Sequence, residues 1–214
     1  MSSSTRVLVV GWDSAPPREV FETWAPEMPN LQRLMSQGCW GNLRSSDPPI
    51  TVPAWASMLS SRNPGQLGFY GFRNRRIGEY EGKWIATARS LKVDRVWDLI
   101  SRTGKRSCVL NVPQTFPLKP VNGAMISCFL TPSTDSEYTY PRSLKPQIEK
   151  AADGYMIDVD NFRTDDKEWL LDQIYQMTEK RFKVARYLLT EQAPWDFFMM
   201  VYMGSDRIQH GFWK

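Results

Sequence analysis

Hydrophobic and polar positions divide the chain into runs whose spacing predicts strands alternating with helices. Residues 6–13 form a continuous apolar run that ends at an acid, and we expect a strand buried on both faces of a parallel sheet. Residues 195–203 repeat this pattern, and shorter apolar runs at 106–112 and 123–129 predict two further strands. These four runs predict a sheet. Both faces of that sheet are apolar and must be covered by helices.

Helical spacing separates the predicted strands. Apolar positions three and four apart predict helices over residues 28–35, over 93–103 up to a glycine, and over 164–192, the longest. Pro53 is suited to the first position of a further helix over 54–59. The pattern predicts an α/β fold, a doubly wound and mostly parallel sheet with helices on both faces.

The length of 214 residues fits one such domain over residues 1–214. Two stretches interrupt the alternation and are expected to be cap or insertion segments. Residues 65–92 are rich in glycine, arginine and aromatic side chains, and residues 130–165 are rich in turns.

Composition narrows the classes of function. Hydrophobic residues make up 42% of the chain, which allows a folded core, and no apolar run is long enough to cross a membrane. The net charge of +4 is spread along the chain without a recognised nucleic-acid-binding module, so we expect no nucleic-acid partner. Three widely spaced cysteines without a C-x-x-C pair argue against a thiolate zinc site and indicate a cytoplasmic protein.

The candidate chemistry follows the ends of predicted strands. Asp13 ends the first strand, Thr51 lies in a proline-rich frame before a helix, and Asp206 precedes the only histidine, His210, by four positions. Each has a plainer interpretation. Asp13 can cap a turn, Thr51 can satisfy a free amide at a helix start, and Asp206 can be a helix N-cap beside an ordinary histidine.

Taken together, these residues predict one site. The C-terminal ends of parallel strands meet at one edge of a sheet, where α/β proteins bind ligands. A hydroxyl at a helix N-terminus meets free amides and the positive end of the helix dipole, which favour phosphate. A divalent cation beside it would lower the hydroxyl pKa, and carboxylate with imidazole suits zinc or manganese better than magnesium.

Four segments in this order resemble the type I phosphodiesterase / nucleotide pyrophosphatase family of the alkaline phosphatase superfamily. They are VLVVGWD at residues 7–13, MPNL at 28–31, PPITVPAW at 48–55 and MGSDRIQH at 203–210. The resemblance runs from Arg6 to Trp213 and implies an alkaline phosphatase-like fold.

The resemblance also implies a mechanism. It implies two divalent metal ions, with zinc favoured and manganese as the alternative, and a small phosphate-ester substrate. Thr51 would be the catalytic nucleophile and would form a phosphothreonine intermediate that is then hydrolysed. One metal would be held by Asp13 and Thr51, and the other by Asp206 and His210.

The chain also departs from the family pattern. The family has a later Asp-His pair and another histidine, whereas His210 is the only histidine here. We therefore expect a truncated form that lacks the C-terminal part, with doubtful metal occupancy and weak or no turnover. The family also places an asparagine after the nucleophile helix to hold a phosphate oxygen, and Asn74 is the substrate-binding candidate here.

Two hypotheses for function follow. The first is a metal-dependent phosphoryl hydrolase of the phosphodiesterase or nucleotide pyrophosphatase type. The alternative is a non-catalytic binding or self-associating protein on the same scaffold, a homo-oligomer that associates through exposed apolar surface.

Overall fold

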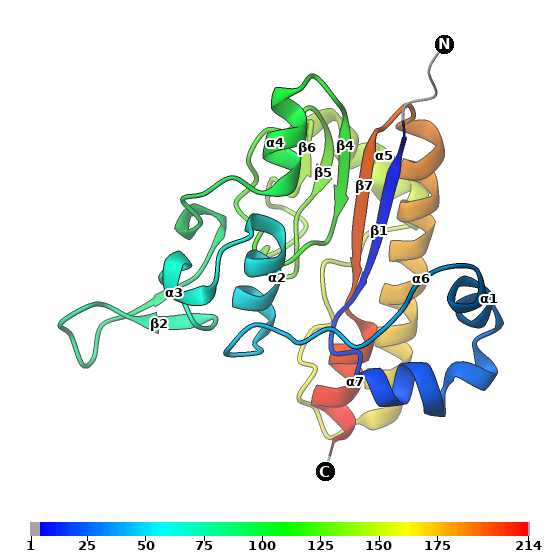
Figure 1. Cartoon of the computed structure of the whole chain (residues 1–214), viewed down its shortest axis with the longest axis horizontal. Coiled ribbons are helices and arrows are strands. Elements are labelled where there is room, and N and C mark those ends of the chain that lie inside the picture. Colours follow the sequence, from blue (N-terminus) through cyan, green and yellow to red (C-terminus); the bar gives the residue numbers. More distant parts are fainter. Residues whose placement is uncertain (1–4, 214) are drawn as a thin grey trace.

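A five-stranded sheet organises the molecule, in a computed structural model that describes residues 5–213. Its strand order is β1-β7-β4-β5-β6, in which β1, β7, β4 and β5 are parallel and the short β6 is antiparallel at one edge. A separate antiparallel hairpin, β2–β3, projects from the body in Figure 1. The strands are Val7–Trp12 (β1), Arg73–Arg75 (β2), Lys83–Ile85 (β3), Ser107–Leu110 (β4), Gly123–Ile126 (β5), Thr139–Tyr140 (β6) and Phe197–Tyr202 (β7).

Helices cover both faces of this sheet, as the sequence predicts. Alternate residues of β7 point to opposite sides: Phe198 packs with α5 and α6, whereas Met199 packs with α2 and α4. The helices are Pro29–Gln37 (α1), Thr51–Ser60 (α2), Pro64–Leu67 (α3), Val96–Arg102 (α4), Lys145–Ala152 (α5), Lys167–Glu191 (α6) and Gly204–Phe212 (α7). None of the helices between residues 5 and 213 has the length and apolarity needed to cross a bilayer.

The first strand differs from its prediction. We expected residues 6–13 to be buried on both faces, but β1 lies at the edge of the sheet and pairs only with β7 (Figure 1). Val7, Leu8 and Val10 are consequently exposed, Val10 to 59%. An apolar run identifies a strand but does not give its position in the sheet, and here the position decides burial.

Helix boundaries also depart from the pattern in ways that matter for the site. The helix expected from Pro53 begins at Thr51, because Ile50 in extended conformation is its N-cap. The last helix begins at Gly204, directly after β7, so Asp206 lies in its first turn and is not its N-cap. Thr51 and Asp206 therefore both lie at helix N-termini.

Candidate active site

Asp13 follows β1 at the point where the pairing of β1 with β7 ends. Its amide donates to the carbonyl of Tyr202 at 3.0 Å, which fixes the backbone beside the end of β7. The side chain is only 7% exposed, and its Oδ2 has no hydrogen-bond partner. Burial, followed by the charge of Asp206, raises the pKa of Asp13 to about 6. This acid is therefore buried, close to another carboxylate, and unsatisfied at one oxygen.

Thr51 approaches this acid because α2 packs directly on β1. A Cβ at Gly11 would lie 2.4 Å from Cη2 of Trp55, so only a glycine lets the indole come this close. The contact brings the first turn of α2 to the end of β1. Thr51 and Asp13 line the same cleft, which has a volume of about 1050 Å³. The Thr51 hydroxyl at a helix N-terminus and the Asp13 carboxylate thus border one space.

Asp206 and His210 lie on one face of α7, as their spacing predicts. Oδ1 of Asp206 accepts a hydrogen bond from Oγ of Ser14 at 2.9 Å and lies 3.6 Å from Nε2 of His210. Oδ2 of Asp206 accepts a hydrogen bond from Arg207. The Asp206 side chain is buried, whereas that of His210 is 52% exposed. The His210 imidazole is therefore accessible to solvent, and it lies beside an Asp206 carboxylate that hydrogen bonds hold in place.

Three polar residues that the sequence analysis did not single out join these segments. Oγ of Ser205 donates to the Asp13 carbonyl at 2.6 Å and accepts from Nε1 of Trp12 at 2.7 Å. Gln209 donates to the carbonyl of Ser14, which adopts a left-handed φ of 54°. The turn after β1 is therefore held to α7 by Ser14, Ser205 and Gln209. Serine and glutamine are too common on surfaces for a sequence pattern to reveal this role.

The structure places Asp13 and Thr51 on one cleft and the Asp206–His210 pair on α7 outside its lining, and Asn74 lies elsewhere. Asp13 and Thr51 line the cleft, Gln209 brings α7 to its wall, and Asp206 contacts the turn at Ser14. Asn74 is in the β2–β3 hairpin and does not line this cleft. The side-chain Oδ1 of Asn74 accepts a hydrogen bond from the backbone amide of Tyr70 at 2.8 Å. The side-chain Nδ2 of Asn74 donates to the backbone carbonyl of Gly71 at 2.9 Å.

The donor set fits a divalent cation in part. The orphaned Oδ2 of Asp13 is a buried anionic oxygen that a cation would satisfy, and Thr51 adds a hydroxyl in the same cleft. Asp206 and His210 form a second pair of donors. Across residues 5–213, however, no three His, Cys, Asp or Glu side chains lie close enough together to hold one metal ion.

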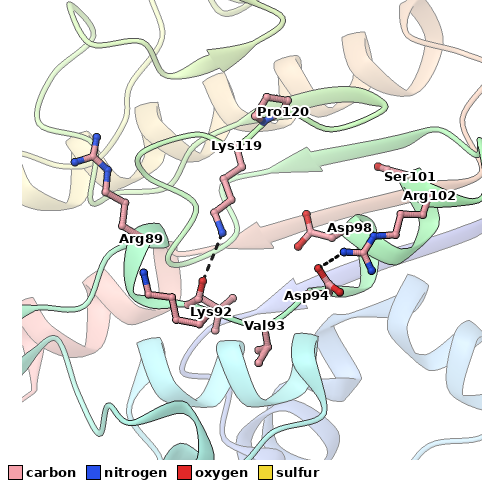
Figure 2. A pocket seen from close by; sticks show the side chains of 10 residues that line it. Arg89, Lys92, Val93, Asp94, Asp98, Ser101, Arg102, Lys119 and Pro120 are labelled. Atoms are coloured by element: carbon pink, nitrogen blue, oxygen red, sulfur yellow. Dashed lines mark hydrogen bonds and ion pairs between the residues drawn. The ribbon is translucent and has the colours of Figure 1, made fainter.

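A second hollow, of about 690 Å³, lies beside α4 and contains none of the predicted residues (Figure 2). Its charged side chains are largely engaged: Arg102 pairs with Asp94 at 2.7 Å, and Lys119 donates to the Leu91 carbonyl at 3.5 Å. The cleft beside Asp13 combines the Thr51 hydroxyl with an unsatisfied buried acid, and we therefore take it as the candidate active site.

Comparisons with known proteins agree with this architecture. The family model described as type I phosphodiesterase / nucleotide pyrophosphatase matches residues 7–214. The search of curated proteins found no match. Among solved structures, phosphonoacetate hydrolase from Sinorhizobium meliloti 1021 in complex with phosphonoacetate has a TM-score of 0.58 and 14% identity, covering 97% of this chain and 48% of that chain. The same enzyme in complex with phosphonoformate has a TM-score of 0.58 and 14% identity, covering 97% of this chain and 51% of that chain.

The structural likeness supports the fold, a mostly parallel α/β sheet with helices on both faces. The chain spans about half the length of these solved structures.

Proposed function

Because the chain belongs to the type I phosphodiesterase / nucleotide pyrophosphatase family, we propose that it is a metal-dependent phosphoryl hydrolase with Thr51 as its nucleophile. The observation that carries this proposal is the shared cleft. Thr51 opens α2 there, opposite a buried Asp13 carboxylate that has an unsatisfied oxygen.

The residues of the cleft would have distinct roles in binding and orienting the substrate. The positive end of the α2 dipole and the Thr51 amide would attract phosphate oxygens and orient phosphorus toward the Thr51 hydroxyl. Asp13, with a pKa near 6, is mostly ionised at neutral pH and would repel a phosphate unless a cation neutralised it. The proposal therefore requires a cation beside Asp13.

We propose that Asp13 and Thr51 hold one divalent metal ion and that Asp206 and His210 hold the other, with zinc favoured over manganese. When bound, the two ions would neutralise the charge on the attacking and leaving oxygens. Each pair supplies only two protein ligands, whereas catalytic zinc normally has three. Weak metal retention and weak turnover by residues 1–214 are the expected result.

The proposed substrate is a small phosphate or phosphonate ester. A cleft of about 1050 Å³ has the size of a small-molecule site, and Arg44 and Arg62 on its wall would favour an anionic ligand. Asn74 stays a prediction as a substrate-binding residue; its side chain is hydrogen-bonded to the backbone of Tyr70 and Gly71, just before β2. A cytoplasmic location is supported by Cys39, Cys108 and Cys128, which are all free thiols.

The test compares hydrolysis of bis-p-nitrophenyl phosphate, with zinc or manganese, by the wild type, Thr51→Ala and Thr51→Ser. We expect weak metal-dependent turnover that Thr51→Ala abolishes and Thr51→Ser partly retains, because serine keeps a hydroxyl at the same position. A Thr51→Ala variant as active as the wild type would refute the assignment of the nucleophile.

The alternative, a non-catalytic self-associating protein on this scaffold, is favoured by one observation. Val7, Leu8 and Val10 give β1 an exposed apolar surface at an edge of the sheet. Light scattering separates the two hypotheses. Concentration-dependent association without any metal-dependent turnover would favour the binding protein, and a monomer with turnover would favour the hydrolase.

A further inference from the structure

One arginine on α7 lies between two carboxylates. The Nε and Nη2 atoms of Arg207 donate to Oδ1 and Oδ2 of Asp158 at 2.8 and 2.6 Å. Its Nη1 atom donates to Oδ2 of Asp206. The guanidinium fork is therefore held on two of its nitrogens by Asp158 and reaches Asp206 with the third.

Aromatic rings fix this guanidinium from its faces. Cζ of Arg207 lies 4.6 Å from the ring centre of Phe162 and 5.3 Å from that of Phe129. Only 6% of the Arg207 side chain is exposed. Burial acts to lower the pKa of Arg207, but hydrogen bonding and the charge of Asp158 outweigh it, and the net pKa is raised. The cation is thus permanent and held in one orientation.

The orientation of Arg207 decides which oxygen of Asp206 stays open. Because Arg207 reaches only Oδ2, Oδ1 remains directed at Ser14 and His210. A guanidinium released from Asp158 could instead present two nitrogens to Asp206 and occupy both of its oxygens, the geometry that arginine prefers with a carboxylate.

We propose that Asp158 is a positioning residue for the metal site: by holding Arg207 on two nitrogens, it stops this internal cation from capturing both oxygens of Asp206. The inference rests on the proposed role of Asp206 as a metal ligand. It gives a function to the turn-rich segment at residues 130–165, which supplies both Asp158 and Phe162. Phe162 also contacts the ring of His210, with centroids 5.7 Å apart.

The proposal predicts an unusual sign in a double-mutant experiment. Asp158→Asn keeps the shape of the side chain but loses its charge, so Arg207 would turn toward Asp206 and compete with a metal ion. Isothermal titration with Zn²⁺ should then show a loss of affinity of about tenfold to a hundredfold. Adding Arg207→Gln to Asp158→Asn removes the competitor and should restore most of the affinity.

The controls isolate this effect from damage to the fold. Asp94→Asn removes the acid of the exposed Asp94–Arg102 ion pair in the other hollow and should leave zinc affinity unchanged. Arg207→Lys in the Asp158→Asn background keeps the charge but cannot grip two oxygens in a planar fork, so it should also restore affinity in part. Thermal melts without metal show whether each variant is folded.

Each outcome bears on the proposal. A double variant that binds zinc as weakly as Asp158→Asn, or an Asp158→Asn variant with unchanged affinity, overturns it. A crystal structure of Asp158→Asn with Arg207 in its wild-type orientation overturns it without any metal measurement. Equal zinc affinity in the wild type and Asp206→Asn would instead refute the proposed metal role of Asp206, and this inference with it.

Discussion

At the scale of single residues, the protonation of Asp13 links the cleft to the stability of the molecule. Its pKa rises from 3.8 to about 6 because burial and the neighbouring Asp206 carboxylate disfavour the charged form. Between these two values, the folded state holds a proton that the unfolded chain releases. The contribution of Asp13 to the free energy of unfolding therefore falls as pH rises from about 4 to about 6, and the folded protein becomes less stable.

Asp13→Asn removes the destabilisation caused by ionising a buried carboxylate, because the asparagine amide stays neutral at all pH values. In metal-free buffer at pH 8 we expect the variant to be more stable than the wild type by up to about 3 kcal/mol, the value of roughly two pKa units. The difference should vanish near pH 4, where the wild-type acid is protonated as well. Urea unfolding at both pH values measures it, and a pH-independent difference would contradict the assigned cause.

Zinc should narrow the difference in stability between the two proteins at pH 8. A cation bound by the Asp13 carboxylate raises the unfolding midpoint of the wild type with the logarithm of the free Zn²⁺ concentration above its Kd, whereas Asp13→Asn has lost the charge that binds it. The measurement is the thermal midpoint as a function of added Zn²⁺. An equal rise in both proteins would exclude Asp13 as a ligand.

The sequence anticipated some of these residues and missed others for a physical reason. Asp13 and Thr51 follow recognisable strands or precede a recognisable helix, so their position at one edge of the sheet could be inferred. Ser205, Gln209 and Asp158 act through partners that are remote in sequence; the bond between Trp12 and Ser205, for example, spans 193 positions. Such partners are fixed by the register of β1 on β7, which local patterns do not specify.

At the scale of elements, the contact between β1 and α2 determines where Thr51 lies. Gly11→Ala would place a methyl group against the Trp55 ring, and the indole or α2 would have to move. We expect a loss of stability of about 1–3 kcal/mol, typical of overpacking, together with reduced turnover. Gly41→Ala is the matched control, since a Cβ there meets nothing within 4 Å and should change stability by less than about 0.5 kcal/mol.

Helix α6 illustrates what periodicity can and cannot predict. The sequence predicts a helix over residues 164–192, and α6 spans Lys167–Glu191 with Leu170 and Ile174 on its buried face. Trp169 and Phe182 of the same helix are partly exposed although they are apolar, whereas the charged Arg181 is buried. Arg181 is buried because it donates to the Ile157 carbonyl, a partner that spacing alone does not reveal.

The cap of α6 offers a separate test. The Asp166 side chain accepts from the Trp169 amide at 3.0 Å. Asp166→Ala should therefore lower the free energy of unfolding by about 1 kcal/mol. Asp165→Ala, at an exposed neighbour outside the cap, should have little effect in the same chemical denaturation experiment. Equal losses in both variants would argue that general charge, and not the cap, is responsible.

At the scale of the whole molecule, the alternation of strands and helices was enough to predict the fold class but not the strand order. β1 has the composition of a central strand and occupies an edge. Its exposed apolar side chains should promote association between copies of residues 1–214. Val10→Lys should reduce that association, because a charge on an edge strand opposes pairing. Light scattering over a concentration series would measure the change, and an unaltered mass distribution would contradict it.

The pairing of β1 with β7 also orders events during synthesis. Val7 pairs with Phe197 and Trp12 pairs with Tyr202. The first strand therefore cannot form its hydrogen bonds until the last strand has been synthesised. A nascent chain that has not yet emerged past Tyr202 therefore carries Asp13 and Thr51 without the turn-to-helix contacts that assemble the cleft. Closing so long a loop is slow, and an early apolar strand is meanwhile open to chaperones. The cleft between Asp13 and Thr51 can therefore be assembled only after nearly all of these residues have left the ribosome.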